Sequence, residues 1–349
     1  MNKGEEKETK KLAQYKQTKP EQLLLFEFTT LDEKKYSNTI ELYDAIPKYY
    51  WGNVERENGR YLSDLKRTFE FRGKKYRVTI RPARIEDRRG VTREYYPSQR
   101  EELVEDALRK LACDGKGLFL DDQAGVMFSL YELQQELKRM GHGYSIVDIK
   151  DALLICAQTN MILETEDGLP IAEYGKATLV SHLFETLGLQ TREDWKGHGN
   201  KSKAYVRFNV LVTNSIKALT FRQLNYEKCM SYKSVIARQL HKRMSHLFTQ
   251  SSLTNTYSIL LSTIIRDFGI KAYSQLRDNL YQVEQALDEM KEKEVIAEYK
   301  VEKSFDPNRK NKMIEAKFII TPHSRFTSDM IKANERHRKL KNYQPLFSK

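Results

Sequence analysis

A short segment around position 273 groups side-chain types that proteins use to read the edges of DNA bases. Ser and Gln side chains hydrogen-bond to base edges, and an Arg guanidinium pairs with guanine through two hydrogen bonds. Leu280, Val283 and Leu287 follow at helical spacing, so the polar segment should begin a helix. A recognition helix meets bases with its N-terminal residues. We interpret the segment as a base-reading site, with an ordinary exposed helix end as the alternative. The residues are Lys271, Tyr273, Ser274, Gln275 and Arg277.

Cations on two neighbouring segments suit contacts with phosphate groups, which position a protein on DNA without reading its sequence. The first segment, 225–248, is predicted to be one long helix and carries Lys228, Lys233, Arg238, Lys242 and Arg243. The second is the polar loop 302–312, between predicted strands at 295–301 and 313–320, and carries Arg309, Lys310 and Lys312. A charged hairpin tip can equally be a solvated turn.

The elements around these residues follow one order twice. Residues 98–184 predict a helix, short apolar strands, two further helices and a β-hairpin, and capping boxes mark the three helix starts. Residues 225–320 again predict three helices followed by a hairpin. This is the order of a winged helix, a helix-turn-helix with a β-hairpin behind it. In the first copy the third helix, 145–160, is mostly apolar, which favours a supporting or dimer-forming role over base reading.

We therefore predict an α+β protein with two tandem winged-helix domains preceded by a small β-rich N-terminal region. The expected boundaries are a disordered leader at 1–21, the β-rich region at 22–97, winged-helix domains at 98–219 and 220–323, and a basic tail at 324–349.

Charge favours a polyanionic partner. The 349 residues carry 60 Lys and Arg against 48 Asp and Glu, a formal net charge of +12. The excess is concentrated in 66–100, 192–243 and 325–349. No apolar run approaches the ~18 residues of a membrane span, and the polar N-terminus does not resemble a signal peptide. We expect an intracellular protein without a membrane role.

Motifs for catalysis are missing from the sequence. Gly175-Lys176 is followed by Ala177, which cannot supply the hydroxyl of a phosphate-binding loop. The seven His residues form neither H-x-H nor H-E-x-x-H, and the cysteines Cys113, Cys156 and Cys229 are far apart. We expect no enzymatic activity, no cofactor and no metal.

Three segments, together with the doubled order of elements, resemble plasmid replication initiators, including the TrfA type. They are Tyr36–Asp44, Tyr96–Glu102 and Ile320–Phe326. The resemblance implies a bacterial cytoplasmic protein that binds short repeated sites (iterons) at a plasmid origin and recruits the host helicase machinery. It also implies a switch between homodimers and DNA-binding monomers.

The apolar cluster Gln22-Leu23-Leu24-Leu25-Phe26 is similar to the Gln-Leu-x-Leu-Phe peptide by which bacterial proteins dock on the DNA polymerase sliding clamp. Gln22, Leu23, Leu25 and Phe26 would be the contacts, with Leu25 and Phe26 as apolar anchors. The alternative is that the segment packs on the protein's own core.

Two other functions fit the same elements: a winged-helix transcription regulator, and a structural or partition protein that binds DNA without sequence preference. Tandem direct repeats beside the gene would favour an initiator, whereas a single palindrome at a promoter would favour a regulator.

Overall fold

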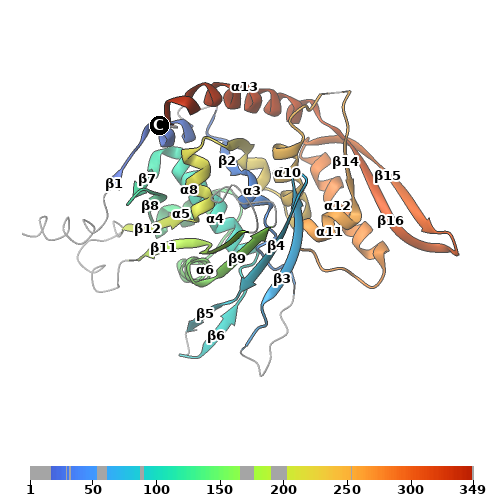
Figure 1. Ribbon diagram of the computed structural model, residues 1–349, viewed down its shortest axis with the longest axis horizontal. Coiled ribbons are helices and arrows are strands. Elements are labelled where there is room, and N and C mark those ends of the chain that lie inside the picture. The colour runs from blue at the N-terminus through green and yellow to red at the C-terminus, as the bar shows by residue number, and fades with distance from the viewer. Residues whose placement is uncertain are drawn as a thin grey trace, which may run out of the picture.

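The computed structural model describes residues 17–28, 30, 33–52, 61–86, 90–165, 177–189, 203–252 and 254–347. Figure 1 shows the arrangement of its helices and strands. They enclose two main hydrophobic cores. The first core takes its residues from Leu23 to Met230 together with Leu340. The second takes its residues from Tyr232 to Ala333. We call the parts around these cores the first half and the second half.

The first half mixes short strands and helices. Its N-terminal elements are β1 (Gln17–Thr18), α2 (Glu21–Phe26), β2 (Tyr36–Ile40), α3 (Glu41–Ala45), β3 (Leu65–Phe71), β4 (Lys74–Arg81), β5 (Ala83–Glu86) and β6 (Thr92–Tyr95). Then follow α4 (Gln99–Leu111), a π-helical turn (Ala112–Lys116), β7 (Gly117–Leu120), β8 (Gln123–Ser129), α5 (Leu130–Arg139), α6 (Ile146–Gln158), β9 (Asn160–Thr165), β10 (Ala177–His182), β11 (Phe184–Gly188), β12 (Lys203–Phe208), α8 (Val210–Lys217), β13 (Phe221–Asn225) and α9 (Tyr226–Met230).

The three predicted capping boxes are present. Ser98 with Glu101, Ser129 with Glu132 and Ser145 with Asp148 begin α4, α5 and α6. In each box the serine hydroxyl and the acidic side chain satisfy backbone N–H groups that a helix start leaves without intrahelical partners. The spacing of the serine and acidic residues therefore predicted the starts of these three helices correctly.

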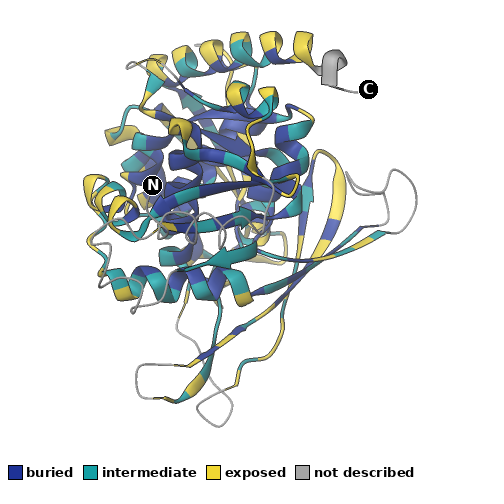
Figure 2. Ribbon diagram, turned by 90° about the vertical axis from the view of Figure 1, so that its left-hand side faces the viewer, coloured by how far each residue is buried: buried dark blue, intermediate teal, exposed yellow. Residues whose placement is uncertain are grey.

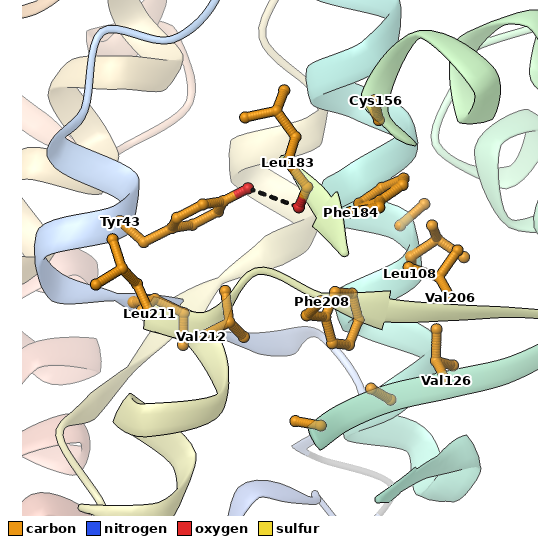
Figure 3. Packing of buried hydrophobic residues seen from close by; sticks show 14 of the residues in the cluster. Tyr43, Leu108, Val126, Cys156, Leu183, Phe184, Val206, Phe208, Leu211 and Val212 are labelled. Atoms are coloured by element: carbon orange, nitrogen blue, oxygen red, sulfur yellow. Dashed lines mark hydrogen bonds between the residues drawn. The ribbon is translucent and has the colours of Figure 1, made fainter. Parts of the chain in front are cut away.

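Strand pairing interleaves the N-terminal region with later parts of the chain. The hairpin β3–β4, which turns at Arg72–Gly73, joins β9 and β10 in a four-stranded sheet of order β10-β9-β4-β3. β2 pairs with β13, and the other large sheet has the order β1-β7-β8-β12-β11. Tyr43 of α3 is buried in the first core, where its hydroxyl donates to the Leu183 carbonyl at 3.4 Å (Figure 3).

The second half has the order helix, strand, helix, helix, hairpin. Its elements are α10 (Val235–Leu247), β14 (Tyr257–Leu260), α11 (Leu261–Asp267), α12 (Leu276–Glu292), β15 (Ile296–Asp306) and β16 (Arg309–Pro322). The strands form one antiparallel sheet of order β14-β16-β15. In Figure 1 the hairpin β15–β16 extends away from the helices at the right of the molecule.

One predicted helix has different bounds. The expected helix at 225–248 is interrupted, because the Asn225 and Ser234 side chains accept backbone N–H groups and each begins a helix of its own. In the same way β12 ends at Phe208, because the Asn209 side chain accepts from the Leu211 N–H and begins α8. Polar side chains with local hydrogen bonds thus set the boundaries of these elements.

The residues expected to form a basic tail make a helix instead, α13 (Ser324–Phe347). Its inner face contributes Phe326, Met330 and Ala333 to the second core and Leu340 to the first. Figure 2 shows α13 along one edge of the molecule with exposed residues on its outer side. No described helix is both long and apolar enough to cross a membrane.

Candidate nucleic-acid interface

The segment before α12 is fixed to the helix by one buried side chain. The Asn279 side-chain oxygen accepts from the Tyr273 N–H at 2.9 Å, and its amide donates to the Lys271 carbonyl at 2.8 Å. Asn279 is buried, so both hydrogen bonds are shielded from water. The Gln282 amide also donates to the Tyr273 hydroxyl at 3.1 Å. These contacts hold the base-reading candidates in one conformation at the start of α12.

The five candidates lie together on the surface, as predicted. Lys271, Tyr273, Ser274, Gln275 and Arg277 are all exposed. Behind them the inner face of α12 packs into the second core through Leu280, Val283 and Leu287. The arrangement offers hydrogen-bond donors, acceptors and positive charge from a rigid support.

Two further residues extend this surface along α12. Tyr281 is 62% exposed, and Gln285 is exposed one turn later. They follow Arg277 by four and eight residues, so all three share one side of the helix. The helical period already marked by the apolar residues could have identified both from the sequence.

The hairpin beyond α12 carries the second group of predicted cations. Arg309 and Lys312 are exposed, whereas the side chain of Lys310 lies outside the described residues. β15 and β16 run well past their expected ends at 301 and 313, and only Pro307 and Asn308 separate them. The sequence predicted the hairpin but underestimated its length, because charged residues occupy the solvent side of both strands.

The structure corrects the prediction that the cations on α10 contact phosphate groups. Arg238 is 0% exposed and its guanidinium donates to Glu102 at 2.8 Å. Lys242 is also buried, with its ammonium 3.0 Å from Glu102 and 2.7 Å from Asp106. These two side chains bind carboxylates of α4, so they cannot reach DNA in this structure.

The other three cations of that group are placed differently from one another. Arg243 is partly buried and pairs with Asp267 at 3.0 Å. Lys228 is also partly buried and donates to the Glu294 carbonyl at 3.1 Å. Only Lys233 is exposed, at the turn between α9 and α10. Of the five predicted phosphate contacts, one has an accessible side chain.

The contacts of Arg238 and Lys242 belong to a larger buried network that joins α10 to the first half. Its carboxylates and cations are equal in number: Asp44, Glu102, Glu105 and Asp106, with Lys48, Arg109, Arg238 and Lys242. Burial alone would raise the pKa of Glu102, but Arg238 and Lys242 outweigh burial and lower it to about 2. Glu102 therefore stays ionised in the folded protein.

The segment resembling a clamp-docking peptide forms α2 and packs inward, which is a second correction. Phe26 is 0% exposed, with its ring 4.9 Å from that of Phe221, and Leu23 is buried beside it. Gln22 and Leu25 are partly exposed, and Leu24 is 51% exposed. A docking peptide needs its Phe anchor accessible, so the structure favours the core alternative for this segment.

In the first half, the helix in the place of a reading helix is covered. α6 packs against β5, and Ala83, Ile85 and Ile155 form a small apolar cluster between them. Cys156 and Leu153 face the first core from the same helix. An apolar helix buried on two sides offers few polar groups to a DNA groove.

Comparisons with known proteins gave matches among solved structures. No family model matches the chain, and no curated protein does. Two crystal structures of domains 2 and 3 of RctB have TM-scores of 0.47 and 0.48 at 11% identity, over 81% and 83% of this chain and 96% and 99% of theirs. The Pi initiator protein in complex with iteron DNA has a TM-score of 0.43 at 10% identity, over 64% of this chain and 91% of its own.

Proposed function

We propose that this protein is a DNA-binding replication initiator in which the start of α12 reads the bases. One observation supports this most directly: five exposed side chains stand at the start of α12 on a segment fixed by Asn279. The elements from α10 to β16 follow the order of a winged helix, and we assign them to that class. We assign the first half, with α4 to α6 and the hairpin β9–β10, to the other winged helix of the proposal.

Each part of the surface has its own role in the proposal. Arg277, Gln275 and Ser274 enter the major groove, where the Arg guanidinium takes guanine as its partner. Tyr281 and Gln285 reach the same groove farther along α12. Arg309 and Lys312 on the hairpin β15–β16 contact phosphates beside it, which adds affinity without sequence preference.

As an initiator, the protein would bind directly repeated sites at a plasmid origin in the bacterial cytoplasm and recruit host replication proteins. It does so by binding alone, without a catalytic step. The buried Phe26 removes the segment 22–26 from the surfaces proposed for that recruitment.

The test is selection of bound sequences from a random pool of DNA duplexes by the full chain. We expect one short sequence to be enriched, and its copies to occur as tandem direct repeats beside the gene. A palindrome at a promoter would instead identify a transcription regulator. Binding with no enriched sequence would reject base reading and favour a structural DNA-binding protein.

A further inference from the structure

The outer face of α13 is a basic surface separate from the start of α12. α13 begins beside the other end of α12: Arg325 forms an ion pair with Glu294, and the His323 N–H donates to the Val295 carbonyl at 3.0 Å. α12 has 17 residues, so its two ends are about 25 Å apart. From there α13 continues over the first half, away from the base-reading residues (Figures 1 and 2).

α13 is held firmly on both halves. Asp329 accepts from the Tyr36 hydroxyl at 2.7 Å and from the Asn225 amide at 2.9 Å. Farther along, the Arg336 guanidinium donates to the Leu25 carbonyl at 2.7 Å and to the Asn38 side chain at 2.8 Å. These part-buried contacts fix the rotation of the helix, and therefore fix which residues face outward.

The outward charged residues of α13 are mostly cations. The exposed charged side chains of α13 are Arg325, Lys332, Glu335, Arg338, Lys339 and Lys341. Among the described residues, Lys332, Arg338 and Lys339 form no ion pair, so their charge is not neutralised within this part of the protein. Lys332 and Lys339 are seven residues apart, about 10 Å along the helix, on the same side.

Positive charge from the first half adds to this surface. The pKa of His337 is lowered to about 4, first by burial and then by the nearby cations Arg222, Lys341 and Arg72. Arg72 belongs to the turn of β3–β4 and is exposed. Glu41, which pairs with Arg72 at 2.6 Å, is the carboxylate placed among these cations.

We propose that the outer face of α13 binds a second DNA duplex through its phosphates. A phosphate backbone binds through charge alone, and each neutralised phosphate releases counterions. A protein partner would need an apolar centre, because the buried middle of protein interfaces is poor in charge. The large apolar side chains exposed on α13, Ile331 and Tyr343, are twelve residues apart and form no such centre.

This inference adds a second duplex to the proposed function, so one chain would join two DNA segments. The test variant is Lys332→Glu/Lys339→Glu, and Lys138→Glu on the exposed side of α5 is the control for a charge change elsewhere. Both change only exposed side chains, so we expect unaltered melting temperatures. The number of short, random-sequence duplexes bound per chain is measured by sedimentation at low ionic strength, and again at rising salt.

We expect two duplexes per chain for the wild type and for Lys138→Glu, and one for Lys332→Glu/Lys339→Glu. At rising salt the wild type should lose the second duplex, because its binding rests on phosphate contacts alone. The same stoichiometry in the wild type and the double variant overturns the proposal. Binding of polyglutamate to α13 in place of the second duplex overturns it in favour of an acidic protein.

Failure of the proposed function gives a different result. If Arg277→Glu leaves the first duplex bound as before, the start of α12 is not a DNA site, and the stoichiometry of the α13 variant still decides the second site. If the wild type binds one duplex and only Arg277→Glu removes it, the second-duplex proposal alone is wrong.

Discussion

Replacing Lys242 by Met should destabilise the protein strongly. The exposed residues of the proposed DNA-binding surface are not changed. The ammonium lies between Glu102 and Asp106, at 3.0 and 2.7 Å, in the buried network that joins α10 to α4. Met fills a similar volume but leaves the network with one excess negative charge. Removing one partner from a buried ion pair costs about 3–5 kcal/mol.

The pKa of Glu102 gives a second route to the same magnitude. Its pKa falls from 4.5 to about 2 on folding, and this difference corresponds to about 3 kcal/mol of stability. A carboxyl whose pKa is depressed in the folded state stabilises the protein above its unfolded pKa. That contribution is lost as the pH falls from about 4.5 towards 2. Glu102→Gln should remove this part of the acid sensitivity.

Urea unfolding of Lys242→Met, Glu102→Gln and the double variant, each at neutral and acid pH, measures both effects. We expect the double variant to be less destabilised than the sum of the single changes, because it removes one cation and one carboxylate and so keeps the charges of the network equal in number. Lys233→Met, at an exposed position, is the control and should change the free energy of unfolding by less than about 0.5 kcal/mol. Equal effects of Lys233→Met and Lys242→Met would refute the buried network.

Three further predictions concern other positions. Phe26→Ala should cost about 3–5 kcal/mol in urea unfolding because it opens a cavity in the first core, whereas Leu24→Ala should be near neutral; a stable Phe26→Ala would contradict the core placement. Burial lowers the pKa of His246 to about 3, so stability should fall as the pH drops below about 6.5, and His246→Gln should weaken that dependence in pH-resolved melting curves. Gly269→Ala should lower the melting temperature, because Gly269 has φ +64° and an added Cβ would lie 2.5 Å from Arg67; an unchanged value would exclude this strain.

Much of the second half could be predicted from the sequence, because its signals are local. Helical spacing of Leu280, Val283 and Leu287 identified the buried face of α12, and the structure places all three in the second core. The polar residues before them were correctly expected on the surface.

The fate of the cations on α10 could not be predicted locally. A cation that binds phosphate and one that is buried against a carboxylate look alike in the sequence. Arg238 and Lys242 are buried because Glu102, 136 and 140 residues away, comes to lie against them. The same limit applied to Phe26, whose partner Phe221 is also distant in the chain. Pairings across the fold decided these positions, and no short pattern reports them.

The central claim, that the start of α12 reads bases, is tested most directly by the ratio of affinities for an enriched duplex and a scrambled one. We expect Arg277→Ala to lower this ratio, because it removes a base contact. The loss should correspond to about 1–3 kcal/mol of binding free energy. Lys312→Ala should leave the ratio unchanged and lower the salt slope by about 1, as loss of a phosphate contact does. An unchanged ratio in Arg277→Ala, or the same response in both variants, would contradict the claim.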